Sequence, residues 1–313
     1  MIFQHGDLNK HYLERINHLK NKGRELNKLV SNYFIAEPLL SIFFCLSYFF
    51  LLQLFEVELG NLLSLFFLLS FLVFIFYFVF LYRAFSTFKN SITRQVSSKN
   101  LKGIDSEKFP AVAKMVYDIS NKMEIEKKIN IYVSNQNSYL PSIEEYSREV
   151  YLILPKNFLL LVRKFPKRAE SLLAHEFGHV LQEDTETWKK IVFFLNFKIK
   201  KKTLIDFINA LYYLIFIIGL FFLPWQGALF LFASVYRNYR TSKQISEMMK
   251  YRSTSEELAD TAAIIYSDGY KLCESILHYV RDDALERVHP LKNQRRSWII
   301  RTMKRWDIPI NLT

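Results

Sequence analysis

The sequence contains little cysteine, glycine or proline, with 2 Cys, 8 Gly and 8 Pro among 313 residues. The two cysteines, Cys45 and Cys273, stand far apart, so neither a disulfide scaffold nor a cysteine-based metal site is expected. The composition also excludes a collagen-like chain, and a hydrophobic content of 50% excludes a disordered one. A chain of this length can bury a sizeable core in one or two domains.

Acidic residues are outnumbered by basic ones, 30 against 42, which gives a formal net charge of +12. Such an excess suggests either nucleic acid or an anionic membrane surface as a neighbour. The sequence contains no element that would read a nucleic-acid groove, so we expect no nucleic-acid partner. Many of the basic residues flank apolar runs instead, which indicates a signal for membrane topology.

Two nearly unbroken apolar runs, at residues 39–55 and 62–82, are separated by a short turn that holds Glu56 and Glu58. A membrane helix needs about 20 predominantly apolar residues. We therefore expect a transmembrane hairpin at residues 38–82 and disfavour the alternative, a buried hairpin of a soluble core. No cleavable signal peptide is visible before the first run.

A second hairpin is expected at residues 204–239, where apolar runs at 207–223 and 228–236 flank a turn. The second run is short. It crosses a membrane only if neighbouring arginines snorkel, and otherwise it is partly re-entrant. Basic residues flank both hairpins, which places both termini and the middle domain in the cytoplasm. The abundance of Phe and Lys suggests a genome of low GC content and hence a bacterium. We therefore expect the membrane to be a bacterial plasma membrane.

The hairpins divide the chain into five segments. The first segment, residues 1–37, carries apolar residues at helical spacing. It either lies on the cytoplasmic leaflet or forms a surface helix of the soluble part. The segments are a basic amphipathic N-terminal segment (1–37), the first hairpin (38–82), a first catalytic part (83–203), the second hairpin (204–239) and a second catalytic part (240–313).

A His-Glu-x-x-His motif occupies residues 175–179, within a stretch with helical periodicity that starts at Pro166. On a helix, His175 and His179 share a face and can present two imidazoles to one Zn²⁺, while Glu176 can take a proton from water that zinc activates. The alternative is two solvent-facing histidines and a surface glutamate. Gly178 costs about 1 kcal/mol in a helix relative to Ala, which is tolerable if something packs close to it.

A catalytic zinc takes three protein ligands, so a third is needed. Glu256 is the candidate, because Asp260 lies four residues later and can orient a ligand histidine. Glu257 competes as a ligand but has no acid four residues on. The alternative is a surface helix capped by Thr254 or Ser255, in which the acids favour the first turn.

The order of motifs resembles the membrane-embedded zinc endopeptidases that include HtpX and the type 1 CAAX prenyl proteases. The resemblance covers about residues 39–300 and continues with an Asp five residues after the second His, at Asp184. It ends with His289-Pro290 and an Arg six residues after that His, Arg295. Two positions depart from the pattern: Leu291 replaces a second Pro, and Ser255 replaces an Arg, with Arg252 about a turn earlier.

The resemblance implies one Zn²⁺ per chain, with Asp184 supporting the site. It implies that His289 and Arg295 contact the substrate carbonyl or the developing oxyanion. Residues 129–133 and 149–154 look like strands. The resemblance implies that a strand edge in this region pairs with extended substrate, near Asn137, Ser138 and Tyr139, whereas a plain structural hairpin is the alternative.

We therefore expect a mainly α integral membrane protein: two transmembrane hairpins and a cytoplasmic α+β zincin-like catalytic domain with a small sheet. The expected activity is that of a zinc metalloendopeptidase, a hydrolase of protein or peptide substrates at the membrane face. An intramembrane protease is disfavoured, because charged residues flank the motif at Lys167, Arg168 and Asp184. A zinc-binding membrane sensor or scaffold without catalysis is the other alternative, and the presence of Glu176 counts against it.

Overall fold

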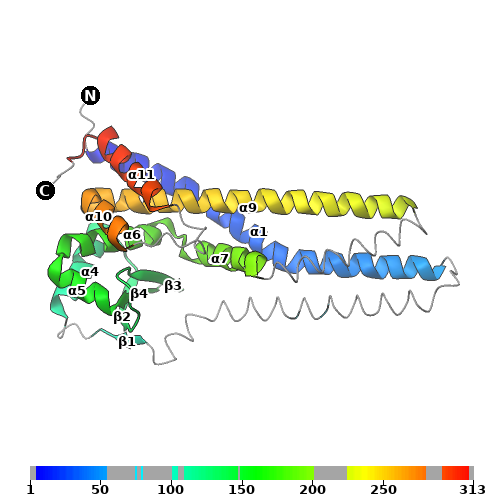
Figure 1. The fold of residues 1–313 in the computed structure, drawn as a ribbon, viewed down its shortest axis with the longest axis horizontal. Helices are drawn as coiled ribbons and strands as arrows, with labels where there is room; N and C mark the ends of the chain where they lie inside the picture. Colours follow the sequence, from blue (N-terminus) through cyan, green and yellow to red (C-terminus); the bar gives the residue numbers. More distant parts are fainter. Residues whose placement is uncertain are drawn as a thin grey trace. The chain divides into compact units, whose positions relative to one another are not determined.

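The protein is mainly helical, with one small sheet. The computed structural model describes residues 5–54, 75, 79, 101–104, 109–146, 149–200, 224–279 and 291–309. The helices (Figure 1) are α1 (His5–Leu54), α4 (Pro110–Lys122), α5 (Lys156–Lys164), α6 (Pro166–Gln182), α7 (Thr185–Lys200), α9 (Pro224–Tyr266), α10 (Gly269–Tyr279) and α11 (Lys292–Arg305).

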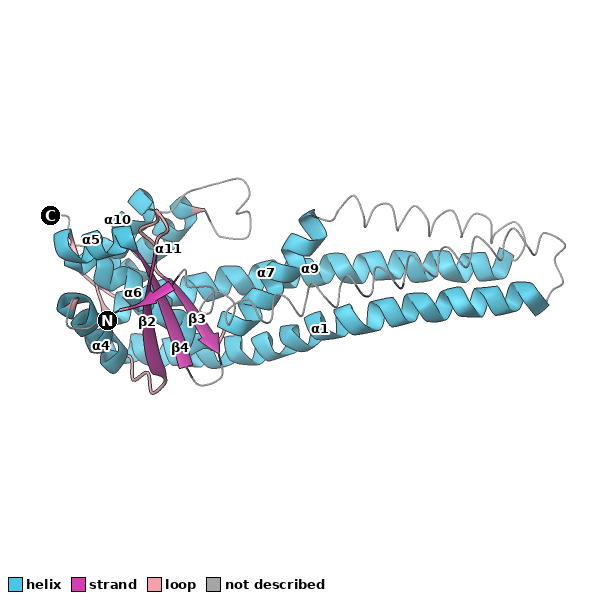
Figure 2. Cartoon of the chain, turned by 90° about the horizontal axis from the view of Figure 1, so that it is seen from below, coloured by secondary structure: helices cyan, strands magenta, loops and turns pink. Residues whose placement is uncertain are grey.

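The sheet has the strand order β1-β2-β4-β3, with β1 (Leu101–Gly103), β2 (Lys128–Ser134), β3 (Ser142–Tyr146) and β4 (Glu149–Pro155) (Figure 2). The two predicted strands are β2 and β4. They pair in parallel rather than as a hairpin, because the segment between them contains β3, which runs antiparallel to β4 on its other side. The alternative of a plain hairpin is therefore wrong.

The chain divides into two compact units. Unit 1 comprises Met1–Glu25, Ile92–Lys189 and Glu247–Thr313, and unit 2 comprises Leu26–Ser91 and Lys190–Ser246. All of the predicted site residues that the structure describes belong to unit 1. Helices α1, α7 and α9 each contribute residues to both units.

Within the part of the chain that the structure describes, no helix combines the length and the apolar character needed to cross a bilayer. Most of the predicted second run of the first hairpin, residues 62–82, lies outside the described residues. The same holds for the run at residues 207–223. Of the two remaining runs, residues 39–54 form the end of α1 and residues 228–236 lie in α9.

The helix predicted near the N-terminus is the first part of α1. Its apolar stripe is formed by Leu8, Tyr12, Ile16 and Leu19, none of which is more than 3% exposed. The spacing of three or four residues places them on one helical face. Because this face is buried within the protein, the segment packs on the rest of the chain, which disfavours the alternative of a helix whose apolar face lies on lipid.

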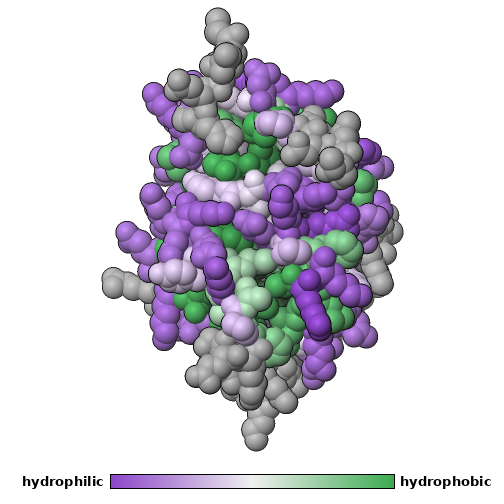
Figure 3. All heavy atoms as spheres, turned by 90° about the vertical axis from the view of Figure 1, so that its left-hand side faces the viewer, coloured by the Kyte–Doolittle hydropathy of each residue, from purple (hydrophilic) through white to green (hydrophobic). Residues whose placement is uncertain are grey.

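Helix α6 occupies the middle of unit 1, where it contacts α4, α5, α10 and strand β3. Its buried side chains include Leu173 and Phe177, both fully buried. On the face drawn in Figure 3, hydrophilic side chains alternate with smaller apolar areas. Exposed apolar side chains such as Tyr117 and Leu160 are normal for a folded surface, whereas the buried polar groups along α6 call for a functional explanation.

Candidate metal centre

Helix α6 carries the His-Glu-x-x-His motif. As predicted, the helix starts at Pro166, and it ends at Gln182, where Glu183 adopts a left-handed conformation (φ 52°) that closes the last turn. His175 and His179 are 6% and 8% exposed, so they are not the solvent-facing pair of the alternative interpretation. Their ring centroids lie 5.0 Å apart, one turn from each other on the same face.

Gly178 allows α6 to approach α9 closely. A Cβ atom at this position would lie 2.9 Å from Cβ of Ala262 and 3.0 Å from Cα of Ala259, both in α9. These distances are shorter than an ordinary van der Waals contact between carbon atoms. The prediction that something packs close to this glycine is confirmed, and the small residues of α9 are the other half of the contact.

The contact brings Glu256 of α9 to the two histidines of α6. Each of the three residues His175, His179 and Glu256 offers one nitrogen or oxygen atom, and these three atoms lie within 4.8 Å of one another. All three residues are buried. The Glu256 carboxylate oxygens lie 3.5 Å from Nε2 of His175 and 3.7 Å from Nε2 of His179. Tetrahedral ligands about 2.1 Å from an ion are separated by about 3.4 Å, so this group can hold a metal ion.

Glu257, the competing ligand, turns away from this group. Its Oε1 atom accepts a hydrogen bond from Nη1 of Arg15 at 3.0 Å. Thr254 and Ser255 lie in the interior of α9, and Thr254 Oγ1 donates to the carbonyl oxygen of Lys250. The alternative interpretation, a surface helix capped by one of these residues, is therefore wrong, because α9 begins far upstream at Pro224.

A carboxylate lies behind each of these two histidines. Oδ1 of Asp260 is 2.9 Å from Nδ1 of His175, and Oδ2 of Asp184 is 3.1 Å from Nδ1 of His179. A proton on Nδ1 that is donated to the carboxylate fixes the ring and leaves Nε2 free to bind a metal. The structure thus places both aspartates beside the histidines, and their predicted supporting roles stay predictions.

Ser255 is a site residue that the sequence interpretation did not assign to the metal centre. Its hydroxyl donates to Oδ2 of Asp184 and lies 3.4 Å from Nδ1 of His179. Ser255 is fully buried and immediately precedes Glu256. In the sequence it was noted only as a departure from the related pattern and as a capping candidate, and no local signal marks its contact with α6.

Two buried arginines offset the negative charge of the carboxylates. Arg252 pairs with Oε1 of Glu256, and its guanidinium carbon lies 3.4 Å from the ring centroid of Trp188. Arg295 of α11 donates from Nε to Oδ2 of Asp260 at 3.1 Å, and its Nη1 lies 3.4 Å from Glu256. Nη2 of Arg295 also lies 3.3 Å from Nδ1 of His175. The contact of Arg295 with substrate stays a prediction.

The buried charges shift several pKa values. Burial lowers the pKa of His179, but the charge of Asp184 and its hydrogen bond raise it more, to about 9. Burial raises the pKa of Asp260, but Arg295 and His175 lower it further, so that it ends below its usual value. Burial raises the pKa of Glu176, and the negative charge of Glu256 adds to the rise. A raised pKa brings a carboxylate closer to the range in which it exchanges protons near neutral pH.

Two of the residues predicted to contact substrate make contacts of their own. Ser138 accepts a hydrogen bond from the backbone of Leu140, within its own loop, and Tyr139 stacks on Tyr279 with ring centroids 4.6 Å apart. Asn137 is exposed in the same loop. His289 lies outside the described residues.

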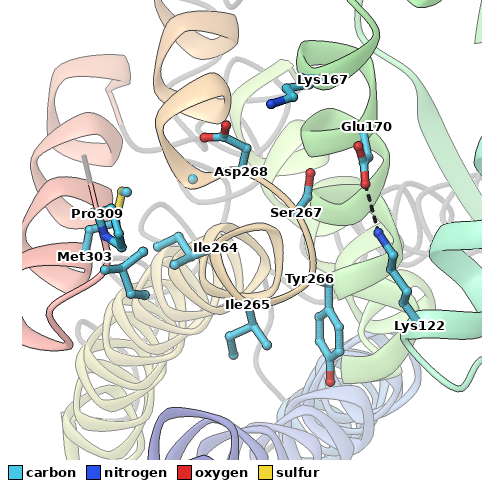
Figure 4. A pocket seen from close by; sticks show the side chains of 12 residues that line it. Lys122, Lys167, Glu170, Ile264, Ile265, Tyr266, Ser267, Asp268, Met303 and Pro309 are labelled. Carbon is cyan, nitrogen blue, oxygen red and sulfur yellow. Dashed lines mark hydrogen bonds and ion pairs between the residues drawn. The ribbon is translucent and has the colours of Figure 1, made fainter. Parts of the chain in front are cut away.

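A pocket of about 670 Å³ lies elsewhere in unit 1 (Figure 4). One wall carries the ion pair of Lys122 and Glu170, with 3.2 Å between Nζ and Oε1, and another is apolar, with Ile264 and Met303. None of the metal-ligand residues lines this pocket. The candidate metal centre is thus a separate feature, built from α6, α9 and α11.

No protein-family model and no curated protein matches the chain.

Proposed function

We propose that the protein is a zinc-dependent endopeptidase that acts at a membrane surface. The observation that carries this proposal is the group His175, His179 and Glu256, with Glu176 next to the first ligand. Two imidazoles and one carboxylate are a ligand set of catalytic zinc, and buried carboxylates behind both rings are typical of such sites. The order of the motifs along the sequence adds support, because it resembles the order in the zinc endopeptidases that include HtpX and the type 1 CAAX prenyl proteases.

A bound zinc ion would polarise the scissile carbonyl and lower the pKa of water in the site. The residues of the chain do the rest. Glu176 takes the proton from the attacking water and passes it to the leaving amine, a sequence that its raised pKa favours. Asp260 and Asp184 keep the two ligand rings oriented. Arg252 and Arg295 hold the Glu256 carboxylate in place.

The membrane location is part of the proposal and rests on the sequence. The apolar runs at residues 39–55, 62–82 and 207–223 are flanked by basic residues. We propose that they anchor the chain in a bacterial plasma membrane, with the metal centre on the cytoplasmic side. Substrates are then proteins or peptides that reach this face of the bilayer.

The experiment compares wild type with Glu176→Gln, both purified in detergent. Bound zinc is quantified, and cleavage of an unfolded protein is followed by gel electrophoresis. We expect both proteins to bind one zinc per chain and only the wild type to cleave. Absence of zinc from the wild type would refute the proposal. If both bind zinc and neither cleaves, the alternative of a zinc-binding membrane sensor or scaffold replaces it.

A further inference from the structure

Ser255 uses its hydroxyl differently from its neighbours on α9. A serine or threonine inside a helix can donate its hydroxyl to the backbone carbonyl one turn earlier. Thr254 and Thr261 of α9 both do so. Ser255 donates instead to Oδ2 of Asp184, the residue between α6 and α7. This hydrogen bond is therefore a link between α9 and the end of the helix that carries the two histidines.

The carboxylate of Asp184 has few other partners. Trp188 donates its backbone amide to the carbonyl oxygen of Asp184 at 2.7 Å, which holds the chain at the start of α7 but not the side chain. Within the part of the chain that the structure describes, Oδ1 is buried without a hydrogen-bond partner. Oδ2 is held by Ser255 and by Nδ1 of His179, which lies 3.1 Å away. Loss of either donor would leave the carboxylate attached at one point, about which it can turn.

The geometry at Oδ2 fits donation by both groups. Oγ of Ser255 lies 3.4 Å from Nδ1 of His179, longer than a typical hydrogen bond from nitrogen to oxygen. An ionised carboxylate only accepts hydrogen bonds, so the hydroxyl and the ring nitrogen each direct a hydrogen at the same oxygen. A proton kept on Nδ1 leaves Nε2 of His179 available to a metal.

The carboxylate beside His175 is also held by a second element. Nε of Arg295, on α11, donates to Oδ2 of Asp260 at 3.1 Å, and Oδ1 of Asp260 lies 2.9 Å from Nδ1 of His175. Each histidine thus contacts a carboxylate that another side chain fixes in place. Because Ser255 immediately precedes Glu256, one short segment of α9 supplies a candidate metal ligand and a contact to the carboxylate beside a second one.

We propose that Ser255 is a positioning residue of the metal centre. It holds the carboxylate of Asp184, which in turn holds the ring of His179 with Nε2 available to the metal. The direct hydrogen bond from Ser255 to Asp184 and the contact of Asp184 with His179 carry this proposal. It rests on the metal binding that belongs to the proposed function and does not require peptidase activity.

The test uses the full chain and the substitution Ser255→Ala, which removes one oxygen atom and introduces a good helix former. Affinity for Co²⁺ is measured by competition with a chelator, and the visible absorbance spectrum of bound Co²⁺ is recorded. We expect affinity to fall about three- to tenfold, less than the loss of about ten- to a hundredfold typical of groups that bond a ligand directly. The spectrum should change, because the ring of His179 is no longer held in one orientation. Circular dichroism checks that the metal-free variant is folded.

Ser275→Ala is the matched control. Ser275 is a fully buried serine of α10, and its hydroxyl bonds the backbone carbonyl of Lys271 at 2.8 Å. We expect this variant to have the affinity and the Co²⁺ spectrum of the wild type. A second comparison places Ser255→Ala in an Asp184→Ala background, where it should cause no further loss of affinity if Ser255 acts through Asp184.

Unchanged Co²⁺ affinity in Ser255→Ala would overturn the proposal, and so would a fall in affinity without a change in the spectrum. An equal loss in the Asp184→Ala background would overturn it as well, because Ser255 would then act independently of Asp184. A similar loss in Ser275→Ala would show a general effect of removing buried hydroxyls. A wild-type protein that binds metal but cleaves no peptide bond would refute the proposed function alone, whereas a wild-type protein that binds no metal would refute both.

Discussion

Nδ1 of His175 lies 2.9 Å from Oδ1 of Asp260, a residue four positions after Glu256 on α9. One turn of α9 therefore supplies both a candidate metal donor and a carboxylate that contacts a candidate donor on α6. The pairing links the two helices at the site, and Gly178 makes the necessary approach possible.

The adjacent acids Glu256 and Glu257 offer a matched pair of substitutions. Glu256→Gln replaces a metal donor with a weak one, so we expect metal affinity to fall at least about tenfold. Glu257→Gln removes only the ion pair with the partly exposed Arg15, and we expect affinity within about twofold of wild type. Chelator competition measures both. Equal losses in the two variants would contradict the ligand assignment.

Metal binding should strengthen with pH up to about 9. The charged His179 ring must lose one proton before Nε2 can bind a metal while Nδ1 keeps its proton and donates it to Asp184. The pKa of His179 is raised to about 9. Below that pH we expect the apparent affinity for Co²⁺ to rise by about tenfold per pH unit, for one proton displaced. The absorbance of bound Co²⁺ follows this titration.

Asp184→Asn is the control for this pH dependence. Removing the carboxylate charge takes away the main cause of the raised pKa of His179, so burial then lowers that pKa. The affinity of the variant should stop rising with pH at a lower value than in the wild type. An unchanged pH profile would show that another group limits binding.

Substitution of Gly178 tests the close approach of α6 and α9. Alanine is the better helix former by about 1 kcal/mol, yet its Cβ would overlap Ala262 and the backbone of Ala259. We expect Gly178→Ala to lower the free energy of unfolding by about 1–3 kcal/mol and to weaken metal binding. Gly103→Ala is the control, because nothing lies within 4 Å of its added Cβ. Increased stability in Gly178→Ala would refute the packing argument.

The ion pair of Lys20 and Glu183 should stabilise the protein only above acidic pH. The hydrogen bond from Lys20 lowers the pKa of Glu183. A lowered pKa in the folded state means that the stabilisation is present above the unfolded pKa, about 4.3, and is lost as pH falls through the folded value. We expect Lys20→Gln to lower the Tm slightly at pH 7 and to leave it unchanged near pH 3, as measured by circular dichroism. A pH-independent difference would contradict this assignment.

The sequence predicted those parts of the site that depend on spacing within one helix. His175 and His179 are four residues apart, as are Glu256 and Asp260, and helical geometry alone places each pair on one face. The choice of Glu256 over Glu257 came from the acid four residues later, Asp260, and the structure places Glu256 in the group with His175 and His179.

The sequence did not predict the contacts that depend on how helices pack. Ser255 faces Asp184 only because α9 continues through it, whereas its composition suggested a helix start. Strand β3 was missed because it is five residues long and carries two glutamates, Glu144 and Glu145, within a segment interpreted as a loop.

The stacking of Arg252 on Trp188 gives the protein an internal optical probe. The same guanidinium that covers the indole ring also binds Glu256. Coordination of a metal by Glu256 withdraws part of that carboxylate from Arg252, which changes the cation above the ring and hence its fluorescence. With Trp225, Trp298 and Trp306 replaced by Phe, the emission of Trp188 would report metal loading directly, without a chelator or a substrate.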